Sequence, residues 1–259
     1  MALKFSRGNA KLGKNTLTFN LPAGHACPFA KLCLSKADRE TGKITDGPDQ
    51  VFRCYGASCE CRYKGMRKMV WDNYDQLRAA KTAERMADLI DEALTPWLKK
   101  MPDCLIRIHS TGGDFFDKQY FRAWCEVARR HPGRQKFMHG MCVVPESEGL
   151  ICYAYTKATP FLLLERPDNF RLVASRGGTR DDLIDSHQLR EAVVCMSEEE
   201  AAAKGLGCTP LDDSHAWAGD KSFALIIHGG QKAGSAAGKA LQANRKAGKF
   251  SGYSLKRQS

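Results

Sequence analysis

The chain has 259 residues, of which 43% are hydrophobic and 27% are charged, as in ordinary globular proteins. This composition excludes a wholly disordered chain, a collagen and a bundle of membrane helices. No apolar run approaches the roughly 18 residues that cross a bilayer, and the first residues lack the apolar core of a secretory signal. We therefore expect a cytosolic protein with no membrane contact.

The surplus of positive charge lies at the two ends of the chain. Lys and Arg number 40 against 29 Asp and Glu, which gives a formal net charge of +11. Residues 1–37 hold six bases and no acid, and residues 221–259 hold eight bases and no acid. Basic segments attract polyanions by releasing counterions, so nucleic acid is a candidate partner of both termini. The alternative is that these charges serve solubility alone.

The predicted elements begin with a short strand at residues 17–21. A segment without sustained periodicity follows and extends to about residue 66; it holds five cysteines. Residues 71–100 then show helical spacing of apolar residues. Beyond residue 100, short apolar strands alternate with helices. The strands are expected at 104–109, 136–139, 170–175, 192–196 and 223–228, the helices at 118–130 and from residue 197, and an insertion at 141–152.

This alternation favours a parallel β/α sheet, as a partial or complete TIM-like barrel or as an open doubly wound sheet. Residues 1–240 are expected to form one such domain with an irregular cysteine-rich N-terminal segment, and residues 241–259 a basic C-terminal tail. Parallel sheets of this kind carry functional groups at the carboxyl ends of their strands. The candidates at those ends are His109, Asp114, His139, Ser175, Arg176 and His228.

Eleven cysteines are the most informative feature of the composition. A reducing compartment and an odd number both argue against a disulfide framework. Cys104, Cys125 and Cys195 occupy apolar positions and are expected in the core.

Cys27, Cys33 and Cys54 follow the first strand, and their spacing matches neither a zinc finger nor the CxxC-type runs of many iron–sulfur proteins. Three thiols around one loop can nevertheless converge on one ion or cluster. Cys59 and Cys61 are too close in sequence to rank equally with them.

Four stretches carry a resemblance that extends from about residue 5 to residue 240. They are LPAGHACP (21–28), FRCYGAS (52–58), RIHSTGGDF (107–115) and FALIIHG (223–229). Together they resemble the bacteriophage "gene product eighty-eight" family. The cysteines after the first strand and the Gly-Asp turn after the next are similar in placement to the loops of radical-SAM barrels, although the CxxxCxxC run is absent. The resemblance implies a β/α barrel-like fold and a location in the cytoplasm of the bacterial host.

The same resemblance implies a [4Fe-4S] cluster held by Cys27, Cys33 and Cys54; Cys27 and Cys54 lie inside the matching stretches, and Cys33 lies between them. We expect Cys208, in a late loop, as the fourth ligand; His109 is its rival, because imidazole can replace a thiolate. His109 and Asp114 flank the Gly-Gly turn and are the candidate catalytic residues. The structural alternative is that His109 is a packed residue and that Asp114 caps the following helix.

Two classes of function stay open. In the first, the protein is a phage-encoded iron–sulfur enzyme with a redox or radical-type role on an unidentified substrate. In the second, it is a nucleic-acid-associated phage protein in which the same thiols hold a structural cluster or zinc. Residues 212–215 (DDSH) offer a further candidate site for a divalent ion or for acid–base chemistry, with a solvated loop as the alternative.

Overall fold

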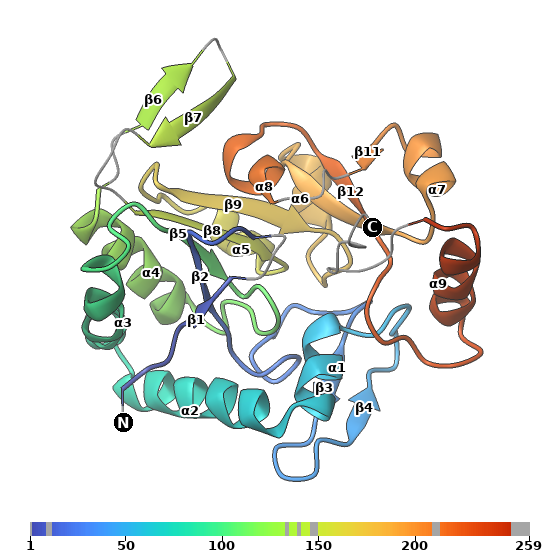
Figure 1. Ribbon diagram of the computed structural model, residues 1–259, viewed down its shortest axis with the longest axis horizontal. Helices are drawn as coiled ribbons and strands as arrows, with labels where there is room; N and C mark the ends of the chain where they lie inside the picture. The colour runs from blue at the N-terminus through green and yellow to red at the C-terminus, as the bar shows by residue number, and fades with distance from the viewer. Residues whose placement is uncertain are drawn as a thin grey trace, which may run out of the picture.

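The computed structural model describes residues 2–8, 12–132, 135–138, 141–145, 150–208 and 213–249 of the chain. Its centre is an eight-stranded sheet (Figure 1), in which one edge pair is antiparallel and every other neighbouring pair is parallel. Across the sheet the strands are β1 (Ser6–Arg7), β2 (Thr16–Phe19), β5 (Leu105–Ile108), β8 (Ile151–Thr156), β9 (Phe170–Ser175), β10 (Glu191–Cys195), β12 (Phe223–Ile226) and β11 (Gly207–Cys208).

Two small hairpins and a set of helices surround this sheet. The hairpins are β3–β4 (Ser35–Ala37 and Ile44–Asp46) and β6–β7 (Gln135–Met138 and Met141–Pro145). The long helices are α1 (Tyr55–Arg62), α2 (Lys64–Ala80), α3 (Ala83–Leu98), α4 (Lys118–Arg130) and α9 (Ala236–Lys246). The short ones are α5 (Thr159–Leu162), α6 (Asp182–Ser186), α7 (Glu198–Ala203) and α8 (Ser214–Ala218).

The prediction of a parallel β/α sheet is confirmed, and the sheet is open. Within the described residues β1 and β11 form its two edges, and no pairing between them closes a barrel. Helix α4 and strand β9 have the predicted bounds, because each carries a complete apolar pattern. The three cysteines expected in the core, Cys104, Cys125 and Cys195, are buried.

Several predictions differ from the structure. The helical stretch expected over 71–100 is two helices, α2 and α3, which meet near Lys81. Cys152, expected in an insertion, lies in the central strand β8 and is fully buried. The segment expected to be irregular contains the hairpin β3–β4 and helix α1. The boundary expected at residue 240 lies inside α9. His139, Asp212 and the tail from residue 250 lie outside the described residues.

The main core fills one face of the sheet. Leu17 and Phe19 of β2 and Ile106 and Ile108 of β5 point to this face, because alternate residues of a strand share a side. Apolar residues of α3 and α4, among them the fully buried Trp124, cover them. Each fully buried large side chain contributes about 2 kcal/mol by leaving water. The core therefore fixes β2 and β5, the two strands whose loops form the site described below.

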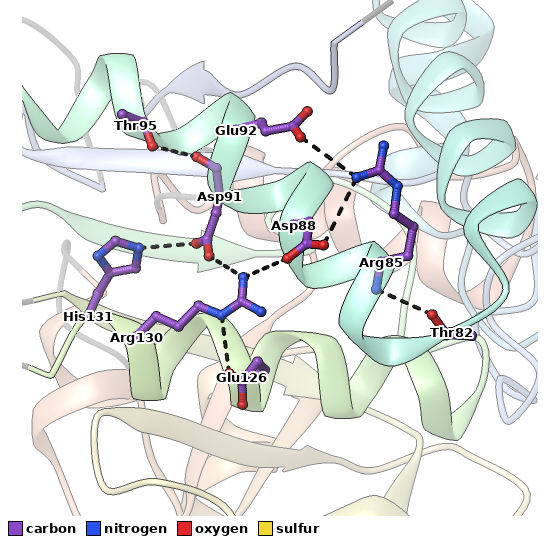
Figure 2. Close-up of polar contacts among 9 residues, drawn as sticks. All are labelled: Thr82, Arg85, Asp88, Asp91, Glu92, Thr95, Glu126, Arg130 and His131. Atoms are coloured by element: carbon purple, nitrogen blue, oxygen red, sulfur yellow. Dashed lines mark hydrogen bonds and ion pairs between the residues drawn. The ribbon is translucent and has the colours of Figure 1, made fainter.

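A network of ion pairs connects α3 to α4 on the outer side of this core (Figure 2). Arg130 of α4 donates to Asp88 at 3.0 Å and to Asp91 at 2.7 Å on α3, and to Glu126 at 3.1 Å on its own helix. His131 contacts Asp91 at 3.1 Å. Burial opposes ionisation of Asp91, yet the hydrogen bonds from His131 and Arg130 lower its pKa. The lowered pKa of Asp91 keeps that carboxylate ionised, so its bonds to Arg130 and His131 stabilise the helix pair at neutral pH.

Candidate functional site

The segment from Leu21 to Cys54 lies across the carboxyl ends of the parallel strands. The N–H groups of Lys31 and Leu32 donate to Gly177 O, in the loop that follows β9. Leu21 N donates to Gly112 O, in the loop that follows β5. The backbone of this segment is therefore bonded directly to the ends of two sheet strands. This is the edge at which a parallel sheet positions ligand-binding groups.

Three double-glycine turns allow this close packing. They follow β5, β9 and β12 and are Gly112–Gly113, Gly177–Gly178 and Gly229–Gly230. Gly113 has φ +94°, and a Cβ there would lie 2.6 Å from Leu21 Cβ. Gly229 has φ +78°, and a Cβ there would lie 2.9 Å from the ring of Tyr55. At both positions the backbone conformation favours glycine, and a side chain would press against the cysteine-bearing segment at Gly113 and against α1 at Gly229.

The structure brings Cys27, Cys33 and Cys54 together over these strand ends. All three are half-buried. Burial raises the pKa of Cys27, and the charges of Asp114, Cys54 and Cys33 raise it further. Burial also raises the pKa of Cys54 to about 12, with Cys33 the next contributor. Thiols affect one another's ionisation only at short range, so the three lie near one another in the structure.

Two features of the local backbone favour thiolates at this site. Gly24 N donates to Cys27 Sγ at 3.3 Å. Cys54 is the N-cap of α1, and the amides of Ala57 and Gly56 act to lower its pKa against the larger effect of burial. Backbone N–H groups at a helix start carry partial positive charge, so they stabilise an anion placed there.

Among the described residues, no three side chains of His, Cys, Asp or Glu are placed to hold one metal ion. Tetrahedral zinc has Zn–S bonds of about 2.3 Å, which requires sulfurs about 3.8 Å apart. A cluster places several irons between its thiolates and accepts a wider arrangement.

Asp114 connects two strand ends next to the thiols. It is 5% exposed, and its carboxylate accepts hydrogen bonds from Thr156 Oγ1 at 2.5 Å, Lys157 N at 2.8 Å and Phe115 N at 2.8 Å. Burial raises its pKa, although these bonds oppose the shift. The cap of α4 is Asp117, whose side chain accepts from Tyr120 N. Asp114 therefore ties the β5 loop to the end of β8 and does not cap the helix.

His109 lies under aromatic side chains. Its backbone is left-handed, with φ +59°, and its Nε2 is 3.1 Å from Tyr120 Oη. The ring packs edge-on against Phe115 at 4.9 Å between centroids. Burial, with a smaller contribution from Arg107, lowers its pKa to about 3. The imidazole is therefore neutral at pH 7. The prediction that it acts at the cysteine site stays a prediction.

Cys208 lies in a different part of the molecule. It is exposed on the edge strand β11 and pairs with Ala224 near the amino end of β12. The charges that act on its thiol are those of Glu198, Lys249 and Glu199. Figure 1 shows β11 beside α7, well away from α1. The structure thus does not bring Cys208 to the other three cysteines.

Glu60 is a member of the site that the sequence did not reveal. It lies on α1 and is 0% exposed. Its Oε1 accepts from Ala23 N at 2.7 Å, in the cysteine-bearing loop. Its Oε2 has no hydrogen-bond partner in the described part of the chain. Burial raises the pKa of Glu60 to about 7, against the lowering effects of the Ala23 amide and the Arg67 charge.

The raised pKa of Glu60 predicts a stability that falls as pH rises. The folded protein holds this proton up to about pH 7, whereas the unfolded chain releases it near pH 4.3. Stability from this group is complete below the unfolded pKa and is lost through pH 7, about 2 to 3 kcal/mol between pH 5 and pH 8. Urea unfolding of the metal-free protein should show this loss, and the Glu60→Gln variant should lack it. Parallel pH profiles for both proteins would contradict the assignment.

Two residues of the 212–215 motif, Asp213 and His215, belong to a second polar cluster on the opposite face of the sheet. Asp213 accepts an ion pair from Arg107 at 3.4 Å, and both side chains are buried. Tyr155 Oη lies 3.4 Å from Asp213 and 3.1 Å from Nε2 of His215. The Arg107 guanidinium lies 3.7 Å from the centre of the Tyr155 ring. These contacts fix α8 to the sheet, so the described part of this motif contributes to the fold. Its role as a site for a divalent ion or for acid–base chemistry stays a prediction.

The fold and site define an α/β protein with an open, mostly parallel sheet and three thiols gathered over the carboxyl ends of its strands. Within this class, the chain belongs to the family described as gene product 88, which matches residues 3–249. No curated protein and no solved structure matches the chain. No helix in the described residues is both long enough and apolar enough to cross a membrane.

Proposed function

We propose that the protein binds a [4Fe-4S] cluster through Cys27, Cys33 and Cys54 and uses it in a redox or radical-type reaction. The observation that carries this proposal is that three half-buried thiols, from separate turns of one segment, lie close enough to affect one another's pKa. The Gly24 amide and the amides at the start of α1 oppose the burial that raises the pKa of Cys27 and Cys54, and so contribute to holding the thiolates that a cluster requires. When bound, the cluster would supply one-electron transfer at the strand ends.

The chain's own residues give the site its surroundings. Lys157 Nζ donates to Ser175 O and Oγ and to Arg176 O, which holds the end of β9 beside the site. Asp114 holds the β5 loop in the same place. The half-burial of the thiols places them in a dielectric below that of bulk water, which strengthens electrostatic effects on a bound substrate. These residues position the site; the substrate is unidentified.

A second candidate function follows from the basic C-terminal part of the chain. Lys239, Arg245 and Lys246 are exposed on α9, and the described residues after Asp220 contain no acid. This supports a nucleic-acid-associated protein in which the cysteines hold a structural cluster or zinc. The alternative requires a metal but no electron transfer, so the identity of the metal and its redox behaviour separate the two.

Replacement of the three cysteines tests the proposal. The Cys27→Ser, Cys33→Ser and Cys54→Ser variants should each lose bound iron and sulfide after anaerobic purification, together with visible absorption that bleaches on reduction. Solubility should fall as well, because the segment folds around the metal. Cys59→Ser and Cys61→Ser, on the adjacent helix α1, are the matched controls and should keep wild-type iron content.

Each outcome of this experiment decides between the proposals. Equal iron in all five variants refutes the ligand assignment. A colourless wild-type protein with stoichiometric zinc removes the redox function and supports the alternative. A coloured protein whose cluster cannot be reduced and reoxidised supports a structural cluster.

A further inference from the structure

The side chain of Glu60 is a buried carboxylate that is only half satisfied. Among the buried side-chain atoms without a hydrogen-bond partner in the described residues, Glu60 Oε2 is the only carboxylate oxygen. A buried polar atom without a partner costs folding free energy, and a carboxylate costs more than a neutral group. Such an atom calls for a ligand that the polypeptide itself does not supply.

The nearest cation does not satisfy this oxygen. Arg67 donates from Nη1 to Glu60 O at 2.5 Å, from Nε to Arg39 O at 3.0 Å and from Nη2 to Glu40 O at 3.1 Å. Its guanidinium is thus bound to three backbone carbonyls. Asp114, the other buried acid of the site, has both oxygens in hydrogen bonds. Glu60 is therefore the acid of this site with an oxygen still available.

The carboxylate of Glu60 lies on the cysteine side of α1. Helical side chains lean toward the start of their helix, and α1 starts at Cys54. Oε1 is bonded to Ala23, four residues before Cys27, and a Cβ on Gly112 would lie 3.3 Å from the same oxygen. The charge of Glu60 also contributes to the raised pKa of Cys54. The carboxylate thus lies between the cysteine loop, the β5 loop and the first turn of α1.

We infer that Glu60 is the fourth ligand of the cluster, bound through Oε2, with Cys27, Cys33 and Cys54 as the other three. This inference rests on the proposed function. Oxygen is a harder donor than sulfur, so the iron bound to Glu60 would differ chemically from the three bound to thiolates and would be the most easily lost. Oε1 stays bonded to Ala23 N, which orients the carboxylate as an outer hydrogen bond orients other metal ligands.

The test is the Glu60→Gln variant, reconstituted anaerobically with ferrous iron and sulfide. Glutamine keeps an acceptor for Ala23 N but offers no anionic oxygen to iron. The variant should lose one iron of four, a fall of about a quarter in iron per chain, and should show the paramagnetic signal of a three-iron cluster when oxidised. Mössbauer spectra of the wild-type protein with enriched iron should show one iron distinct from the other three.

Two further variants make the result decisive. Glu40→Gln alters a highly exposed acid of the same segment and should keep four irons and the wild-type spectrum. Glu60→Asp keeps the charge but withdraws the carboxylate by one methylene, and it too should lose the fourth iron. Thermal melting of the metal-free variants checks folding; if Glu60→Gln does not fold, Glu60→Asp carries the test.

The possible failures are distinguishable. A wild-type protein that takes up no iron–sulfur cluster overturns the proposed function and this inference with it. A wild-type cluster whose iron content and Mössbauer spectrum are unchanged in Glu60→Gln overturns the inference alone and leaves the three-cysteine proposal standing.

Discussion

Gly56→Ala should destabilise the protein by about 3 kcal/mol or more, the upper part of the range for overpacking. Gly56 is the second residue of α1, and a Cβ there would lie 2.2 Å from Thr111 O and 2.7 Å from Gly112 Cα. Both are backbone atoms of the β5 loop, so no side-chain rotation relieves the overlap. The helix would have to move away from the loop, and Cys54 at its start would move with it.

Gly65→Ala is the matched control for this prediction. Gly65 is also the second residue of its helix, α2, but a Cβ there meets nothing within 4 Å. Alanine favours the helix over glycine by up to about 1 kcal/mol, so this variant should be as stable as the wild type or more so. Urea unfolding measures both. If both alanines stabilise, the close contact between α1 and the β5 loop is wrong.

Most of the sheet was predictable because its strands and helices carry complete apolar patterns. The run from Phe170 to Ser175 forms β9, and the run from Lys118 to Arg130 forms α4, with the bounds expected from periodicity alone. Helix α1 was not predictable. Its sequence, YGASCECR, has no apolar period and contains weak helix formers, and its packing against the β5 loop holds it in place.

The residues of the candidate site also differ in how far the sequence alone predicts them. Cys27, Cys33 and Cys54 were predicted to share a site because cysteines are crowded into one segment, and in the structure their charges act on one another's pKa; their role as metal ligands stays a prediction. Glu60 gave no signal, since its importance comes from burial between Ala23 and Gly112, which only tertiary contacts create. The three Gly-Gly pairs follow predicted strands in the sequence. Nothing in the sequence showed that these glycines let the cysteine-bearing segment pack closely against the strand ends.

Cys208 was predicted to join the other three cysteines, and the structure places it elsewhere. A late loop near a strand was expected to return to the carboxyl edge of the sheet. In the structure this cysteine lies on β11, which adds to the outside of β12 next to its amino end. The order in which strands join a sheet depends on long-range pairing, which a single sequence does not display.

Asp114→Ala should be the second strongly destabilising change, with a loss of about 3 to 5 kcal/mol. The Asp114 carboxylate accepts from Thr156 Oγ1, Lys157 N and Phe115 N, and it is 5% exposed. Removal leaves three buried donors without an acceptor and releases the β5 loop from β8. Asp114→Asn should lose less stability than Asp114→Ala. The asparagine Oδ1 can still accept from Thr156 Oγ1 and Phe115 N, and only the hydrogen bond from Lys157 N is lost, because the new amide group is a donor.

Asp117→Ala provides the comparison within the same loop. Asp117 accepts a single hydrogen bond, from Tyr120 N, as the cap of α4, so its removal should cost about 1 kcal/mol. Urea unfolding should therefore rank the variants Asp117→Ala, Asp114→Asn and Asp114→Ala in order of increasing loss. If Asp114→Ala unfolds like the wild type, Asp114 does not hold the β5 and β8 loops together, and its position beside Cys27 would favour instead the catalytic role expected from the sequence.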